Sequence, residues 1–326
     1  MIGEILKRTG IMLIKDADIA GYGPWLKFIW KAHISNWLWR DSQTRRLTRQ
    51  RHYQEMKMGY LEKYVPFVKS LHAKDNTYDR PAEDEKVYSL WFQGLESAPK
   101  VVKRCIESIR KIYGDRYVVL DDLTMRDYID LPDYIMEKWE RKQIGPANFS
   151  DIVRIELLTK YGGFWFDATD YLLRPVPPEI VNSDFFMYVT SPVLYTHMFV
   201  QTCFIRAKYG DPLIRMWRDL VFEYWKHEKR SADYFLVHLL FKLLVTHNDE
   251  AKRLYEKMPK LYQDNLHDFW YVYGHKPYDA EDYKKLCRET FFQKCSYRKL
   301  KHAVWEIQPG SMADYLINGK IDKEKV

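Results

Sequence analysis

The sequence predicts an α/β domain built on a mostly parallel sheet, with helical elements before and after it. A β-prone run at Val87–Phe92 is followed by an amphipathic helical segment and then by a second strand at Tyr117–Leu120, which is the order of a βαβ unit. Later in the chain, Phe164–Phe166 is apolar on both faces, as expected of a central strand that is covered on both sides. Sheets of this kind bind ligands beyond the carboxyl ends of their strands.

Residues 1–80 are expected to form a helical region that is basic and rich in aromatic residues. They hold 15 Lys/Arg against 8 Asp/Glu, whereas the rest of the 326-residue chain holds 37 of each, so the net charge of +7 arises here. Four Trp between Trp25 and Trp39 lie among cations, which suits either a helix lying flat on an anionic membrane or a helix packed on the domain. Positive charge confined to a leader argues against nucleic acid as the partner. No segment reaches the ~20 apolar residues that span a bilayer, and no secretory signal is found.

After a polar linker at residues 73–85, one domain is expected over residues 86–310, with 311–326 as a C-terminal tail. A helix should run from Pro99 to Tyr113, because its apolar residues recur at helical spacing and Gly114 follows it. The elements expected after the second strand are a helical region at Leu131–Pro146, a helix with Ser150 as its N-cap that ends at Gly162-Gly163, strands at Phe185–Val189 and Gln201–Ala207, a helix capped by Asp211 that runs to Lys226, and an apolar helix at Tyr234–Val245.

The four cysteines are widely spaced and include no CxxC pair. Cys105, Cys203, Cys287 and Cys295 also lack the spacing of a zinc site. We therefore expect reduced, mostly buried thiols in a cytosolic protein.

The stretch from Ser150 to Asp170 carries the most informative chemistry. Asp151 and Arg154 are three residues apart on a helix and so share a face. Asp167 ends the apolar strand, and Thr169 and Asp170 follow it. One cation and several carboxylates in a small volume suit a site for a sugar diphosphate, where carboxylates hold a divalent ion that bridges the two phosphates. Taken singly, Asp151 and Arg154 also fit a surface ion pair worth ~0–1 kcal/mol.

With these residues in place, the chain resembles the capsular polysaccharide synthesis family, part of a wider DXD-containing group of sugar transferases related to glycosyltransferase family 32. The matching pieces cover roughly residues 86–300 in the family's order. They are Leu90-Trp91-Phe92-Gln93-Gly94 with Ala98-Pro99, Ser150-Asp151-Ile152-Val153-Arg154, Tyr161-Gly162-Gly163, Trp165-Phe166-Asp167-Ala168-Thr169, Asp233-Tyr234-Phe235 and Gln293-Lys294-Cys295-Ser296-Tyr297-Arg298.

The resemblance implies a GT-A-type, Rossmann-like domain that binds a nucleotide sugar, and a divalent ion, Mn²⁺ or Mg²⁺, as cofactor. Thr169 stands where the wider group has the second acid of its DXD element, so either Asp170 substitutes for that acid or the ion binds weakly through Asp167 and a C-terminal group. The residues expected at the donor are Trp91, Gln93, Gly94, Asp151, Arg154, Asp167, Ala168, Thr169 and Lys294, with Lys294 over the diphosphate. Those expected at the metal are Asp167, Thr169, Asp170 and Gln293.

Asp233 is the candidate for the acceptor side of the reaction centre, and it joins Asp167 as a predicted catalytic residue. It comes just before the apolar helix that carries His238, which we place on the acceptor side as well. By residue type alone, Asp233 fits a helix N-cap equally well, and a histidine on an apolar face is more often a core residue. We expect front-face transfer with retention, in which the protein contributes positioning and electrostatic stabilisation, with a double displacement through Asp233 as the alternative.

The function expected from this resemblance is retaining transfer of a hexose, galactose or glucose, from a UDP-sugar to a saccharide acceptor in bacterial capsule or surface polysaccharide synthesis. A lipid-diphosphate-linked acceptor and a peripheral location at the inner face of the cell membrane would suit the basic leader. Two alternatives remain at this stage. One is a carbohydrate-binding scaffold without catalysis, and the other is a metal-dependent hydrolase or phosphotransferase using Asp121, Asp122, Asp167 and Asp170, which would lack a phosphate-cradling glycine loop.

Overall fold

The structure of the protein is a computed structural model that describes residues 42–73, 84–190, 199–262, 265–297 and 307–321. The Trp-rich segment at residues 25–39, for which the sequence predicts a membrane-surface or packed helix, lies outside the described residues.

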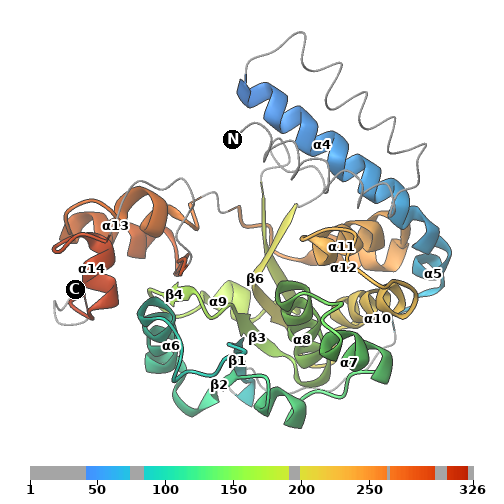
Figure 1. Ribbon diagram of the computed structural model, residues 1–326, viewed down its shortest axis with the longest axis horizontal. Helices are drawn as coiled ribbons and strands as arrows, with labels where there is room; N and C mark the ends of the chain where they lie inside the picture. Colours follow the sequence, from blue (N-terminus) through green and yellow to red (C-terminus); the bar gives the residue numbers. More distant parts are fainter. Residues whose placement is uncertain (1–41, 74–83, 191–198, 263–264, 298–306, 322–326) are drawn as a thin grey trace.

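A five-stranded sheet forms the centre of the molecule (Figure 1). Its strands lie in the order β2-β1-β3-β6-β5, with the following bounds: β1 Val87–Leu90, β2 Tyr117–Leu120, β3 Gly163–Phe166, β5 Phe185–Val189 and β6 Val200–Ala207. β1 pairs in parallel with β2 and β3, whereas β6 is antiparallel to both β3 and β5. β5 therefore points the same way as the first three strands, which confirms the predicted mostly parallel sheet and is consistent with a Rossmann-like fold.

A second, two-stranded sheet starts beside the end of β3. It consists of β4 (Asp170–Leu172) and β7 (Phe292–Lys294), which run antiparallel with Asp170 opposite Lys294. This pairing brings a residue from near the end of the chain to the carboxyl edge of the central sheet.

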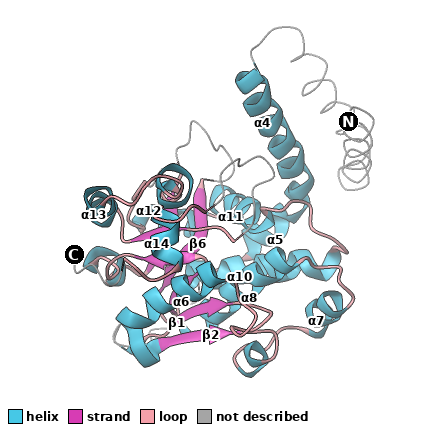
Figure 2. Cartoon of the chain, turned by 60° about the vertical axis from the view of Figure 1, so that its left-hand side comes forward, coloured by secondary structure: helices cyan, strands magenta, loops and turns pink. Residues whose placement is uncertain are grey.

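Helices cover both faces of the central sheet (Figures 1 and 2). Successive residues of a strand point to opposite faces, so Trp165 is buried in one apolar cluster while Phe164 and Phe166 are buried in the other. The first cluster is closed by α7 (Asp133–Glu140), α8 (Pro146–Tyr161), α10 (Pro212–His227), α11 (Leu236–His247) and α12 (Asp249–Lys257). The second is closed by α6 (Lys100–Tyr113), α9 (Pro178–Val181), a π-helical turn at Phe269–Tyr273, α13 (Ala280–Glu289) and α14 (Met312–Ile317).

The last part of the N-terminal region packs on the domain. α4 (Ser42–Leu61) leads through a 3-10 turn at Glu62–Tyr64 into α5 (Val65–Ser70), and Leu61, Tyr64 and Val68 are buried in the first cluster. Asn248 donates hydrogen bonds to the carbonyls of Val68 and Leu71, both at 2.8 Å. This stretch is thus held against α11 and α12, while the amino end of α4 projects from the body of the molecule (Figure 1).

The starts of α8 and α11 differ from the sequence prediction. α8 begins at Pro146 after Gly145, so Ser150 lies inside the helix and the prediction that it is the N-cap is wrong. Proline suits a first helical turn because its φ is already helical and its missing N–H would have no partner there. α11 begins at Leu236 rather than at Tyr234, whereas the predicted cap of α10 is confirmed, since Asp211 accepts a hydrogen bond from the amide of Ile214 at 2.8 Å.

Gly162 and Gly163 connect α8 to β3, and both have positive φ. A Cβ at Gly163 would lie 2.2 Å from the carbonyl oxygen of Lys86, the residue before β1. Only glycine therefore allows β3 to lie this close to the start of β1.

All four cysteines are free thiols. Among the described helices, none combines the length and the apolar character that crossing a bilayer requires.

Candidate active site

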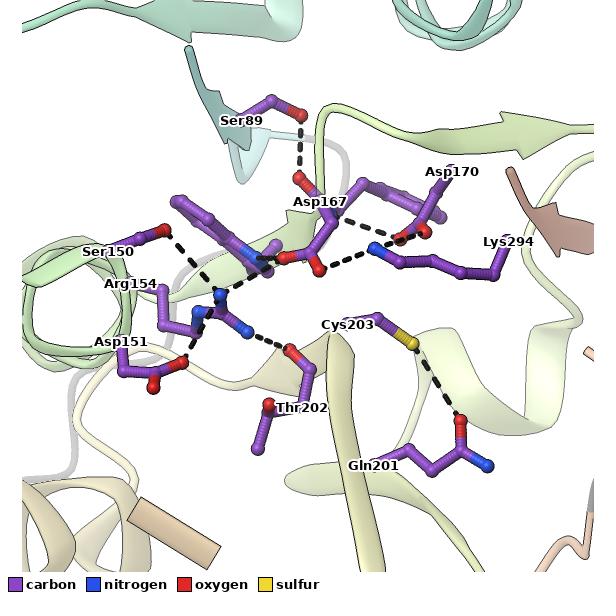
Figure 3. Close-up of polar contacts among 12 residues, drawn as sticks. Ser89, Ser150, Asp151, Arg154, Asp167, Asp170, Gln201, Thr202, Cys203 and Lys294 are labelled. Carbon is purple, nitrogen blue, oxygen red and sulfur yellow. Dashed lines mark hydrogen bonds and ion pairs between the residues drawn. The ribbon is translucent and has the colours of Figure 1, made fainter. Parts of the chain in front are cut away.

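Arg154 is the centre of a buried polar cluster at the carboxyl end of β3 (Figure 3). Its guanidinium lies 3.2 Å from Asp151 and 3.1 Å from Asp167, and it donates a hydrogen bond to the carbonyl of Thr202 at 2.5 Å. The side chain of Arg154 is only 7% exposed. The helix α8 and the strand β3 therefore converge, and the predicted meeting of Arg154 with Asp167 is present.

Local structure explains this geometry. Asp151 and Arg154 are separated by three residues of α8, so both project from one face of the helix toward β3. The ring of Trp165 lies under the guanidinium, 5.0 Å from its carbon to the ring centroid, and the Trp165 indole donates a hydrogen bond to Asp167 at 2.9 Å. Trp165 thus orients both members of the ion pair.

Lys294 enters the cluster from the opposite side (Figure 3). Its ammonium lies 2.5 Å from Asp167 and 3.2 Å from Asp170. The second oxygen of Asp170 accepts a hydrogen bond from the amide of Asp167 at 3.0 Å. The cluster is therefore continuous, from Asp151 through Arg154, Asp167 and Lys294 to Asp170.

Burial and charge act in opposite directions on these groups. Burial alone would raise the pKa of Asp167, but Arg154 and Lys294 outweigh it and hold the pKa of this carboxyl below its usual value. Burial raises the pKa of Asp151 to about 7 despite Arg154, and that of Asp170 to about 8 despite Lys294.

His238 lies near Arg154 and is connected to it through Thr202. The ring Nε2 of His238 is 3.3 Å from the hydroxyl of Thr202, and burial, together with Arg154, lowers the pKa of His238 to about 4. Asp167 and Asp233 both lie close enough to oppose that shift. Asp233 thus lies near His238, and His238 is neutral at physiological pH.

Asp233 is paired with the N-terminal region. Its carboxylate lies 2.6 Å from the ammonium of Lys57 in α4, and its other oxygen accepts a hydrogen bond from the amide of Phe235 at 2.6 Å. The second contact lies in the turn before α11, whose N-cap is Phe235, so Asp233 is not the helix N-cap that its residue type allowed. The contact with Lys57 was not predicted. The residues that follow Lys57 hold the same part of the domain, because Tyr60 and Tyr64 donate hydrogen bonds to Glu228 at 2.7 and 2.9 Å.

Three of the residues predicted at the donor, Trp91, Gln93 and Gly94, follow β1. Gly94 has a φ of 73°, and a Cβ there would lie 3.8 Å from Asp121 at the end of β2. Trp91 packs edge-on against Tyr297, with ring centroids 5.0 Å apart, while Gln93 is exposed. These residues lie at the carboxyl edge of the sheet, as predicted, and their contact with a nucleotide stays a prediction.

The residues predicted as metal ligands do not all face one point. Gln293 is fully buried and points away from Lys294, because adjacent strand residues face opposite sides. Its amide accepts from the backbone of Phe269 at 2.8 Å and donates to Asn265 and Thr290, both at 3.0 Å, so it lies outside the cluster that its predicted metal role requires. Ala168 is buried in the second apolar cluster. Across the part of the chain that the structure describes, no three Asp, Glu, His or Cys side chains are grouped as metal ligands.

Comparison with known proteins places the chain in a family. A model of the family described as capsular polysaccharide synthesis protein matches residues 36–311. The chain belongs to this family. The family match includes every residue of the Arg154 cluster and Asp233, and it extends over α4 and α5.

Two curated relatives are O-glycosyltransferases by name. The chain is 26% identical to O-glycosyltransferase braB of Annulohypoxylon truncatum over 159 residues, which are 44% of this chain and 38% of the relative. It is 25% identical to O-glycosyltransferase PaGT of Phomopsis amygdali over 174 residues, which are 47% of this chain and 42% of the relative. The chain thus spans about two fifths of the length of these relatives. No solved structure matches significantly. Membership of the capsular polysaccharide synthesis family and these relatives support a glycosyltransferase.

Two members of the site were not predicted. Thr202 offers a backbone carbonyl to Arg154 and a hydroxyl to His238, and Lys57 pairs with Asp233. A backbone carbonyl carries no sequence signal, and Lys57 is one of many cations in its region. The only cue for Thr202 is its place at the start of a strand that ends up beside β3.

Proposed function

We propose that this member of the capsular polysaccharide synthesis family is a retaining glycosyltransferase that moves a hexose, galactose or glucose, from a UDP-sugar to a hydroxyl acceptor. The observation that carries the proposal is the meeting of Arg154 with Asp167, 3.1 Å apart, at the carboxyl edge of the sheet. That edge is where α/β sheets bind their ligands. A GT-A-type domain is part of the proposal, supported by the small β4–β7 sheet that leaves the end of β3.

The residues suit distinct roles in such a transfer. Asp151 and Arg154 would bind hydroxyls of the donor sugar, and Asp167 would contact the ribose or the sugar. The ammonium of Lys294, on the other side of Asp167, would neutralise the diphosphate as it leaves. Because these groups are already held in place by one another, they stabilise developing charge without reorganising during the reaction.

We infer a front-face reaction. The acceptor oxygen forms the new bond to the anomeric carbon on the side from which UDP leaves, the bond between that carbon and the diphosphate oxygen breaks, and the hydroxyl proton ends on the departing phosphate. Asp233 would orient the acceptor, and its pairing with Lys57 fixes the direction of its carboxylate. This role for Asp233 depends on positioning, not on a covalent bond.

The acceptor is proposed as a lipid-diphosphate-linked saccharide in bacterial polymer synthesis, reached from the cytoplasmic face of the membrane. The basic composition of residues 1–80 and the apolar side chains of Tyr234 and Phe235, exposed next to Asp233, support this location. Removing residues 1–41 should weaken binding to vesicles containing anionic lipid and leave UDP release from the donor unchanged. Equal vesicle binding by the shortened chain would contradict the membrane role.

The central test is turnover. The full chain is incubated with a panel of UDP-sugars, and released UDP is measured with and without acceptor. We expect slow release without acceptor, its loss in Asp167→Ala and Arg154→Ala, and its retention in Asp115→Ala, which removes an exposed carboxylate just before β2. Binding without release would favour a carbohydrate-binding scaffold, and release of inorganic phosphate would favour a hydrolase or phosphotransferase.

A second test separates the two retaining routes. In a front-face reaction, no covalent bond forms between the sugar and the protein. Asp233→Asn should therefore slow transfer, and neither wild type nor the variant should carry a glycosyl adduct. Intact-mass measurement of wild type and variant after rapid quenching provides the readout. A glycosyl adduct that disappears in Asp233→Asn would establish the double displacement instead.

A further inference from the structure

The position between Asp167 and Asp170, where the sequence predicts a divalent ion, is taken by the ammonium of Lys294. That nitrogen lies 2.5 Å from one carboxylate and 3.2 Å from the other. The lysine is not a loose surface side chain. It lies in register with Asp170 across the β4–β7 pair, and its backbone amide donates a hydrogen bond to Leu266 at 2.7 Å. Backbone pairing thus holds a positive charge between the two acids.

The remaining carboxylate oxygens also have partners of the wrong kind for a metal. The other oxygen of Asp167 accepts from Trp165 at 2.9 Å and faces Arg154 at 3.1 Å. The other oxygen of Asp170 accepts from the amide of Asp167 at 3.0 Å. Manganese and magnesium sites are built from oxygen ligands with free lone pairs, and magnesium requires near-octahedral geometry. Here each oxygen faces an N–H donor or a cation.

Thr169, at the third position of the DXD-like motif, does not supply the missing metal ligand. Thr169 replaces an acid, and its backbone carbonyl accepts a hydrogen bond from Cys295 at 2.8 Å. Gln293, the other predicted ligand, faces away with its amide fully engaged. The residues present do not fit a divalent ion bridging the donor phosphates.

We propose that Lys294 supplies the positive charge that a divalent ion would otherwise bring to the donor diphosphate, so that this chain binds its nucleotide sugar without a metal. The proposal rests on the UDP-sugar function proposed above and adds that donor binding needs no metal ion. The side chain of Lys294 is 18% exposed, and its ammonium contacts both Asp167 and Asp170. A lysine acts on phosphate as a point charge, which suits a single fixed position near the leaving group.

The experiment measures UDP binding by calorimetry to the full chain, in EDTA and in millimolar Mn²⁺. We expect the same affinity in both buffers for wild type. Lys294→Ala and Lys294→Gln should bind UDP about 10- to 100-fold more weakly in EDTA, the range of one charge-assisted hydrogen bond. Lys285→Ala is the matched control, because Lys285 is an exposed cation on α13, and its UDP binding should equal that of wild type.

A second measurement needs no nucleotide. Electron paramagnetic resonance of added Mn²⁺ should show no tight binding to wild type, and none to Lys294→Ala, because the other carboxylate oxygens keep Trp165, Arg154 and the amide of Asp167 as partners. Circular dichroism of each variant establishes that it is folded. Tight Mn²⁺ binding by wild type, or UDP binding that vanishes in EDTA and returns with Mn²⁺, would overturn the proposal and leave the transferase function standing. Absence of UDP binding in both buffers would overturn the donor assignment and this proposal with it.

Discussion

Replacing Arg154 with methionine tests whether the buried cluster is held together as the structure indicates. The substitution keeps a long apolar side chain over Trp165 and removes the charge that faces Asp151 at 3.2 Å and Asp167 at 3.1 Å. Asp167 retains Lys294 as a partner, so Asp151 is the carboxylate left without a cation. Breaking a buried pair by removing one partner costs about 3–5 kcal/mol of unfolding free energy.

The companion Asp151→Asn removes the stranded charge. In Arg154→Met/Asp151→Asn we therefore expect recovery of about 1–3 kcal/mol, the coupling typical of residues in direct contact. The single variant should also depend on pH. Burial raises the pKa of Asp151 to about 7 even with Arg154 present. Without the arginine this carboxyl is protonated at pH 5.5. At pH 8.5 the unfolded state gains stability by releasing that proton, so keeping Asp151 buried lowers the free energy of unfolding. The loss of stability should be larger at pH 8.5.

Urea denaturation followed by tryptophan fluorescence at both pH values provides the assay. The double variant is also assayed for UDP release, where we expect no activity despite recovered stability, because both groups proposed at the donor sugar are gone. A single variant within 1 kcal/mol of wild type at pH 8.5, or a double variant no more stable than the single one, would refute the paired cluster.

Three further predictions concern charged groups outside the Arg154 cluster. Lys57→Met removes the partner of Asp233, so transfer to acceptor should fall while UDP release without acceptor stays unchanged; equal loss of both would contradict a role confined to the acceptor. Glu85→Ala leaves Arg206, its partner at 2.9 Å, buried and unpaired, and should cost about 3–5 kcal/mol in urea denaturation, with recovery in Glu85→Met/Arg206→Met. Burial raises the pKa of Asp211 to about 7, above its unfolded value, so its stabilising contribution is present below about pH 4 and is lost as the pH rises through 7. Asp211→Asn, which keeps the cap, should therefore melt higher than wild type at pH 8 and lose that advantage near pH 4.

Local sequence patterns predicted the site residues on α8 and at the end of β3, which are consecutive elements of the chain. Asp151 and Arg154 share a helical face because of their spacing, and Asp167 follows a strand whose apolar faces are evident. Ser150 was misread because serine is a good N-cap, while the proline four residues earlier already begins the helix. The prediction that Gln293 joins the metal failed to account for strand alternation, which turns Gln293 away when Lys294 faces the acids.

The sequence by itself determined the class of the fold, the edge of the sheet that carries the site, and the helix and strand that supply Arg154 and Asp167, because helical and strand periodicities are local properties of the chain. Only the tertiary structure decided which charge each carboxylate meets. The partners of Asp170 and Asp233 are Lys294 and Lys57, which are distant in sequence and reach them through the β4–β7 pairing and the packing of α4. Which of the chain's 52 cations is selected depends on how the elements pack, and that information is not contained in any single segment.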